Sequence, residues 1–168
     1  MILVVQNSST MPTNMDSLRV GPWRAEFDRD ATVRAHAAMP TGGAETCKCQ
    51  SCRNYTAQKP VPFPSDFLEL LSRLGIDANK EIEVYEMEPD DPQGVEYFGW
   101  FYFVGLVEAD DGAQDPGNGP LVTDFSYYLA AGPAYAVEQF TDQPLARVEF
   151  QCFRLPWAKG FSPGKSPE

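Results

Sequence analysis

The pattern of hydrophobic and polar positions divides the chain into a first part with helical periodicity and a second part with the alternation typical of strands. The clearest helical pattern runs over residues 65–75, where apolar side chains recur every three or four positions. Ser65 is a residue type that caps helix N-termini, and Gly75 suits the left-handed conformation that ends helices. We therefore expect a helix between these two residues.

Two shorter helices are predicted upstream of this one. Residues 31–38 follow Asp30, a good N-cap, and stop before Pro40, which cannot continue a helix. Residues 53–58 have the composition of one or two helical turns, which Pro60 would end. The first part of the chain is thus expected to supply short helices joined by loops.

Strand patterns flank these helices and dominate the second part of the chain. Residues 18–27 alternate as in a hairpin that bends at Gly21-Pro22. Past residue 80, five segments have strand character: 81–87, 95–107, 121–130, 135–140 and 146–155. The Gly-, Pro- and Asp-rich stretch 110–120 reads as a hairpin loop. This order predicts an α+β fold, with N-terminal short helices and an antiparallel sheet of about five or six strands.

The segment 95–107 is aromatic on both of its alternating faces. A central strand covered on both sides has this pattern, and a ligand-stacking or partner-binding wall would have it too. Gly99 within the run indicates a bulge or a close approach of another backbone.

The length of 168 residues suits a single domain with a core of its own. Residues 1–15 are expected to form a disordered or loosely attached extension, residues 16–157 a single α+β domain, and residues 158–168 a flexible tail. No apolar run approaches the roughly 20 residues that span a bilayer, and the N-terminus lacks the pattern of a signal peptide. A cytoplasmic location is the resulting expectation, with no membrane partner.

The net charge of -11 is distributed unevenly. Through Lys59 there are seven Lys and Arg against five Asp and Glu, a balance of +2, so the remainder carries six basic and 19 acidic residues, a balance of -13. Binding to phosphate backbones needs clustered positive charge, which this sequence lacks. Nucleic acid is therefore not an expected partner.

The candidate chemistry is concentrated in the segment Cys47-Lys-Cys49-Gln-Ser-Cys52. Zinc takes four tetrahedral ligands at a Zn–S distance of about 2.3 Å, and the CxxC spacing lets two sulfurs bind from one turn. Cys49 and Cys52 have that spacing, and Cys47 adds a third thiol. Gly42 and Gly43 would let the chain fold tightly around the ion. The segment therefore predicts a zinc site.

The fourth ligand of such a site is left open by the sequence. Cys152 is the first candidate, if its strand passes the cluster, and His36, the single histidine, is the alternative. Glu45 or a water molecule could also complete the coordination, and a water would leave the open position that catalytic zinc needs.

Two other interpretations compete with metal binding. Cys49 and Cys52 could form a redox dithiol at a helix N-terminus, where the helix dipole and Arg53 would lower the thiol pKa. A thioredoxin-like site, however, expects a strand directly before its CxxC motif, and a loop is predicted here. Alternatively, the cysteines could be small buried hydrophobic residues without reactivity.

The segment Cys-x-Cys-x-x-Cys-Arg-Asn-Tyr, followed by the apolar stripe of 67–75 and an acidic-aromatic strand, resembles a group of uncharacterised bacterial proteins. The resemblance covers roughly residues 23–107 and the Leu155-Pro156-Trp157 end. It implies no known activity. Cys152 is no fixed part of that group's pattern, which favours three cysteines with another ligand.

Two further features have simpler interpretations than a binding site. The acidic run that contains Glu81, Glu83 and Glu86 is typical of a solvated edge strand. His36 would be the base of any Ser-His or Cys-His nucleophile, but its position on a short amphipathic helix indicates a partly exposed surface residue. An enzyme is therefore the less favoured class.

Three function hypotheses follow. The favoured one is a non-enzymatic intracellular domain with a structural zinc bound by Cys47, Cys49, Cys52 and either Cys152 or His36, which binds another protein. The second is a metal-dependent or thiol-redox enzyme that uses the same cluster. The third is a metal-free module that binds a protein through the aromatic sheet face.

Overall fold

The computed structural model describes residues 15–87, 91–112 and 124–163. Its helices are α1 (Arg29–Ala38), α2 (Gly43–Thr46), α3 (Gln50–Gln58) and α4 (Ser65–Leu74), with a 3-10 turn η2 (Glu138–Phe140). Its strands are β1 (Asp16–Val20), β2 (Trp23–Phe27), β3 (Glu83–Met87), β4 (Val95–Ala109), β5 (Phe125–Ala131) and β6 (Leu145–Leu155). The α+β fold predicted from the sequence is confirmed, with six strands in the sheet.

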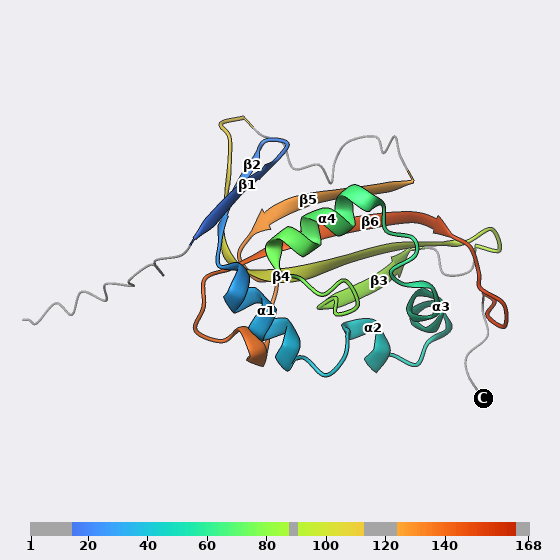
Figure 1. Ribbon diagram of the computed structural model, residues 1–168. Coiled ribbons are helices and arrows are strands. Elements are labelled where there is room, and N and C mark those ends of the chain that lie inside the picture. The colour runs from blue at the N-terminus through green and yellow to red at the C-terminus, as the bar shows by residue number, and fades with distance from the viewer. Residues whose placement is uncertain (1–14, 88–90, 113–123, 164–168) are drawn as a thin grey trace, which may run out of the picture.

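All strand pairs in the sheet are antiparallel, in the order β1-β2-β4-β6-β5. The short strand β3 pairs with the first half of β4, and β2 pairs with its second half. In the view of Figure 1, α1, α2 and α3 follow one another beneath the strands, α4 lies across them, and the β1–β2 hairpin stands at the end opposite α3. The long strand β4 therefore connects both ends of the molecule.

Alternation along β4 buries side chains on both faces of the sheet. Tyr97, Phe101 and Phe103 belong to the larger core cluster, which includes residues of α3 and α4. Tyr102 and Val104 point the other way, into a second cluster with residues of α1 and η2. This confirms the central-strand interpretation of the aromatic segment.

Glycine and capping residues fix where several elements meet. A Cβ atom on Gly99 would lie 2.6 Å from the Glu83 carbonyl oxygen and 2.7 Å from the Phe150 ring, which confirms the predicted close approach. Gly75 ends α4 with a φ of 80°. The helix N-termini differ from the prediction: Asp28, not Asp30, caps α1 through its bond from the Ala31 N–H at 2.8 Å.

Two other boundaries differ from expectation. Ser65 is the first residue of α4, and Pro64 takes the cap position without a side-chain bond. The strand predicted over 135–140 is wrong, because this segment has no strand and its second half forms the turn η2. The Tyr102 hydroxyl accepts the backbone N–H groups of Ala134 and Tyr135 at 2.9 and 3.0 Å, so these donors are satisfied without a partner strand.

The predicted extension 1–15 and loop 110–120 lie largely outside the described residues, as does the start of the predicted strand 121–130. Of the predicted tail, the structure describes residues up to 163, and the Ala158 N–H donates to Asn54 Oδ1 of α3 at 2.7 Å.

Within the described ranges, no helix has the length and apolar character that crossing a bilayer requires.

Candidate metal centre

The three clustered cysteines lie at the junction of α2 and α3. Cys47 follows the last residue of α2, and Cys49 is the N-cap of α3. Both have extended backbone conformations, with ψ angles of 139° and 158°, so an extended link joins two short helices. The Cys49 sulfur accepts the N–H of Cys52 at 3.3 Å, as the side-chain oxygen of an ordinary N-cap would. Local capping geometry therefore brings the thiols together.

The distances between the thiols suit a single ion. The sulfurs of Cys47 and Cys49 lie 3.3 Å apart, and all three Sγ atoms lie within 4.8 Å of one another. Tetrahedral coordination at a Zn–S distance of about 2.3 Å separates the sulfurs by about 3.8 Å. Small side-chain rotations would bring the three thiols to that spacing. These cysteines could therefore hold a metal ion.

The three thiols differ in burial and acidity. Cys47 is exposed, Cys49 is half-buried and Cys52 is buried. The Cys49 backbone N–H hydrogen-bonds to the Cys47 sulfur and, more than any other contact, lowers the pKa of Cys47. Burial raises the pKa of Cys49, and it raises that of Cys52 far more. The exposed thiol is thus the most readily ionised of the three.

Buried polar contacts hold α3 on the sheet. The Tyr97 hydroxyl of β4 donates to the Ser51 carbonyl oxygen at 2.7 Å, and Asn54 Nδ2 donates to the Tyr97 hydroxyl at 3.2 Å. Asn54 is fully buried, and Nδ2 also lies 3.3 Å from the Pro156 carbonyl oxygen. The first turn of α3, and with it the cluster, is thereby fixed to β4 and to the chain after β6.

Cys152, the first predicted fourth ligand, lies outside the group of three. It sits on β6 opposite Tyr97 and is 4% exposed. Burial above all raises the pKa of Cys152 to about 11. It belongs to the same core cluster as Tyr55 of α3, whose ring packs against Tyr97 at 5.4 Å. Its sulfur is not among those that lie within 4.8 Å of one another.

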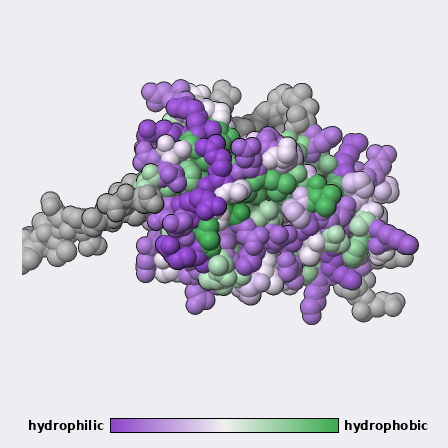
Figure 2. Space-filling model, in the orientation of Figure 1, coloured by the Kyte–Doolittle hydropathy of each residue, from purple (hydrophilic) through white to green (hydrophobic). Residues whose placement is uncertain are grey.

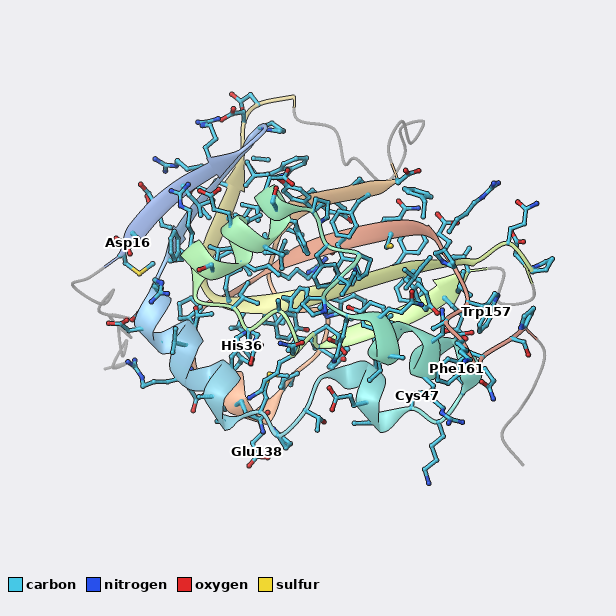
Figure 3. All side chains as sticks on the ribbon, turned by 45° about the vertical axis from the view of Figure 1, so that its right-hand side comes forward. Asp16, His36, Cys47, Glu138, Trp157 and Phe161 are labelled. Atoms are coloured by element: carbon cyan, nitrogen blue, oxygen red, sulfur yellow. The ribbon has the colours of Figure 1, made fainter. Side chains whose placement is uncertain are left out.

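His36, the alternative ligand, is also separate from the cluster. Figure 3 shows Cys47 at the end of the molecule that carries Trp157 and Phe161, and His36 well away from it. The prediction of a partly exposed side chain is wrong, because His36 is 2% exposed and its ring packs edge-on against Phe140 at 5.5 Å. Its Nε2 lies 2.9 Å from the Tyr102 carbonyl oxygen, and burial lowers its pKa. The ring is therefore a neutral donor to the sheet backbone.

Glu45 is engaged in a buried ion-pair network. The Lys59 ammonium, on a side chain only 4% exposed, lies 2.9 Å from Glu45 Oε1 and 3.1 Å from Glu81 Oε2. It also donates to the Asn79 carbonyl oxygen at 2.7 Å. Burial raises the pKa of Glu81, and Lys59 acts against that rise. This network joins α2, the end of α3 and the chain before β3.

The two glycines before the cluster serve this network. A Cβ atom on Gly42 would lie 2.5 Å from Glu81 Oε1, and one on Gly43 would lie 2.3 Å from the Ile82 carbonyl oxygen. The Ala44 N–H donates to Glu81 Oε1 at 3.1 Å. Gly42 and Gly43 therefore let α2 approach the chain before β3, whereas we had expected them to let the chain fold around the ion.

The sequence did not indicate that Glu81 is a buried structural residue. The acidic run was interpreted as a solvated edge, but Glu81 is 0% exposed. Lys59 carries no signal in the sequence that marks it as its partner. The pair Gly42-Gly43 was the available signal, since adjacent glycines indicate a close approach of another segment.

Comparison with known proteins adds no identification, because no protein-family model, curated protein or solved structure matches this chain. The resemblance of the cysteine segment to uncharacterised bacterial proteins stays a prediction.

Proposed function

We propose that this protein is a non-enzymatic domain with a structural zinc ion bound by Cys47, Cys49 and Cys52. The observation that carries the proposal is the placement of all three sulfurs within 4.8 Å of one another at the N-terminus of α3. The ion would join the end of α2 to the first turn of α3, where hydrogen bonds to Tyr97 hold the helix on the sheet. Its role is to fix this junction.

The competing interpretations fit the site less well. A redox dithiol at Cys49 and Cys52 needs an activated thiol, but burial raises the pKa of both. Inert packing suits Cys52, which is buried, but not Cys47, which is exposed next to the half-buried Cys49. Three thiols of one short segment, within 4.8 Å of one another, can act together as ligands of a single zinc ion.

Purification under reducing conditions, followed by metal analysis, tests the proposal. We expect about one zinc ion per chain, because three thiolates bind zinc tightly. Cys49→Ser should lose the ion, since Cys49 is central to the group. Cys152→Ser is the matched control and should keep the ion, because Cys152 lies outside the group of three sulfurs. A metal-free wild-type protein that does not take up added zinc would contradict the proposal.

A second observation supports a protein-interaction role. Six side chains point to the side of the sheet away from α3 and α4 and form what we term the aromatic–acidic face: Glu83, Tyr85, Met87, Glu96, Phe98 and Trp100. Tyr85 and Met87 are 45% and 48% exposed, and the rings of Tyr85 and Phe98 stack at 5.4 Å. Aromatic rings beside carboxylates attract cations. We propose a positively charged extended segment of another protein as the occupant.

The surface on the side that carries α4 is mostly polar. In the view of Figure 2, hydrophilic residues predominate there and hydrophobic ones gather near the middle. The chain's net charge of -11 also favours a positively charged partner.

Binding of a fluorescent peptide of alternating Lys and Val checks this role. Tyr85→Ser should weaken binding about fivefold, since a cation–π contact contributes about 1 kcal/mol. Val61→Ser, at an 87% exposed position after α3, is the matched control and should change nothing. Equal binding of an alternating Glu and Val peptide, or full binding by the Tyr85 variant, would rule out the aromatic–acidic face.

A further inference from the structure

The residue opposite Tyr97 on the edge strand has no partner assigned so far. In the pairing of β3 with β4, Glu86 lies directly opposite Tyr97. Directly opposed residues of antiparallel strands point to the same face of a sheet. The Tyr97 hydroxyl on that face donates to the Ser51 carbonyl oxygen in the first turn of α3. Glu86 therefore shares its face with the N-terminus of α3, where the thiols lie.

A row of three side chains crosses the sheet beneath α3. Tyr97 is in the middle, with Glu86 on β3 at one side and Cys152 on β6 at the other. Strand β3, which carries Glu86, contacts both α2 and α3, the two helices that flank the thiols. The clustered sulfurs thus lie toward the Glu86 end of the row.

In the part of the chain that the structure describes, Glu45 and Glu83 are the other carboxylates of this region, and each is engaged or points elsewhere. Glu45 is paired with Lys59. Glu83 is three residues before Glu86, so it points to the opposite face, where its Oε2 accepts the Tyr135 hydroxyl at 3.3 Å. Among the described residues, the half-buried Glu86 makes no hydrogen bond or ion pair. Its carboxylate is available at the site.

We propose that Glu86 is the fourth ligand, which closes a Cys47, Cys49, Cys52 and Glu86 zinc site. The inference rests on the proposed zinc site and goes beyond it. Carboxylate oxygen is an ordinary zinc ligand at about 2.0–2.2 Å. The carboxylate lies outside the 4.8 Å group of sulfurs, so binding requires rotation of the Glu86 side chain. Because β3 and α3 are separate elements, this bond would fasten the edge strand to the cluster.

The charge of the closed site is balanced by its surroundings. Three thiolates and one carboxylate around Zn²⁺ give a net charge of about -2. Lys48 and Arg53, both exposed, flank Cys49 and Cys52 in the same segment. The Arg53 guanidinium lies 5.4 Å from the centre of the Phe161 ring, which holds it at this end of the molecule.

Competition for zinc between the full-length protein and a chromophoric chelator tests the proposal. Glu86→Gln should lower zinc affinity at least tenfold, because loss of even an outer partner of a zinc ligand costs about 10–100-fold. Glu83→Gln removes the same charge from the same strand on the other face, and it should stay within about twofold of wild type. Glu86→His should restore most of the affinity, since imidazole is an equally good zinc ligand.

Cobalt absorption provides a readout that reports the ligands directly. Glu86→Cys should raise the thiolate-to-cobalt charge-transfer absorption of the Co²⁺ form by about a third, from three thiolates to four. If wild type binds zinc but Glu86→Gln binds it equally well, Glu86 is not a ligand and the three-cysteine site stands. If wild type binds no zinc, the proposed function fails before this inference is reached. If Glu83→Gln lowers zinc affinity as much as Glu86→Gln does, the effect is due to charge alone and the proposal is overturned.

Discussion

Replacing Lys59 by methionine should destabilise the protein by about 3–5 kcal/mol, because it leaves a buried carboxylate without its counter-charge. Glu81 is fully buried, and Lys59 lies 3.1 Å from its Oε2 atom. Methionine fills a similar volume, so the loss reports charge and hydrogen bonding more than packing. Urea unfolding at neutral pH, followed by circular dichroism, measures the change.

The effect should depend on pH with a definite sign. Burial already raises the pKa of Glu81 above its usual 4.5, and Lys59 opposes that rise. An acid whose pKa is higher in the folded state lowers stability as pH rises from its unfolded pKa through its folded pKa. Removing Lys59 raises the folded pKa further. The penalty of Lys59→Met should therefore be largest at neutral pH and smallest near and below pH 4.5.

The double variant Lys59→Met/Glu81→Gln is the control. It removes the buried charge as well, so it should recover a large part of the lost stability. Arg34→Met, which removes an exposed positive charge from α1, should change stability little. A Lys59→Met penalty that is small, or that does not shrink on acidification, would show that Glu81 does not need its partner.

Removing zinc should lower the free energy of unfolding by about 4 kcal/mol, relative to a solution in which free zinc is a thousand times the Kd of the site. The reason is linkage: an ion that binds the folded chain better than the unfolded one stabilises it. Urea unfolding with buffered zinc and with excess chelator gives the difference. This difference in unfolding free energy should increase linearly with the logarithm of the free zinc concentration.

Cysteine variants separate this effect from general destabilisation. Cys49→Ser should make stability independent of zinc. Cys152→Ser should lower stability with and without zinc, because it alters a buried side chain, but it should keep the zinc-dependent part. A wild-type protein equally stable with chelator and with zinc would mean that the cluster does not bind the ion in the folded state.

The sequence predicted well what depends on local periodicity. The stripe and C-cap of α4, the hairpin around Gly21 and the long aromatic strand are each decided by neighbouring residues, and each is present. The three thiols are also a local feature, since capping geometry over six residues brings them together. The fold class followed from the order of these elements.

What the sequence did not predict depends on contacts between distant residues. The buried Glu81 carboxylate is paired with Lys59, which lies 22 positions earlier in the sequence. The buried His36 ring hydrogen-bonds to the Tyr102 carbonyl oxygen, 66 positions later. The segment 135–140 has strand composition, but the distant Tyr102 hydroxyl accepts the N–H groups of Ala134 and Tyr135 where it begins. The register that places Glu86 opposite Tyr97 is likewise a tertiary property. No local pattern encodes such pairings.

The hydrogen bonds of Asn54 have a consequence for synthesis. The ribosome completes the cysteine segment about one hundred residues before it completes Pro156 and Ala158, whose backbones bond to Asn54 at separations of 102 and 104 positions. During that interval α3 lacks these anchors, and Cys52 lacks the cover that β4 and β6 provide. The thiols are therefore open to metal and to oxidants in the nascent chain. Capture of an ion at that stage would also protect them until β6 joins the sheet.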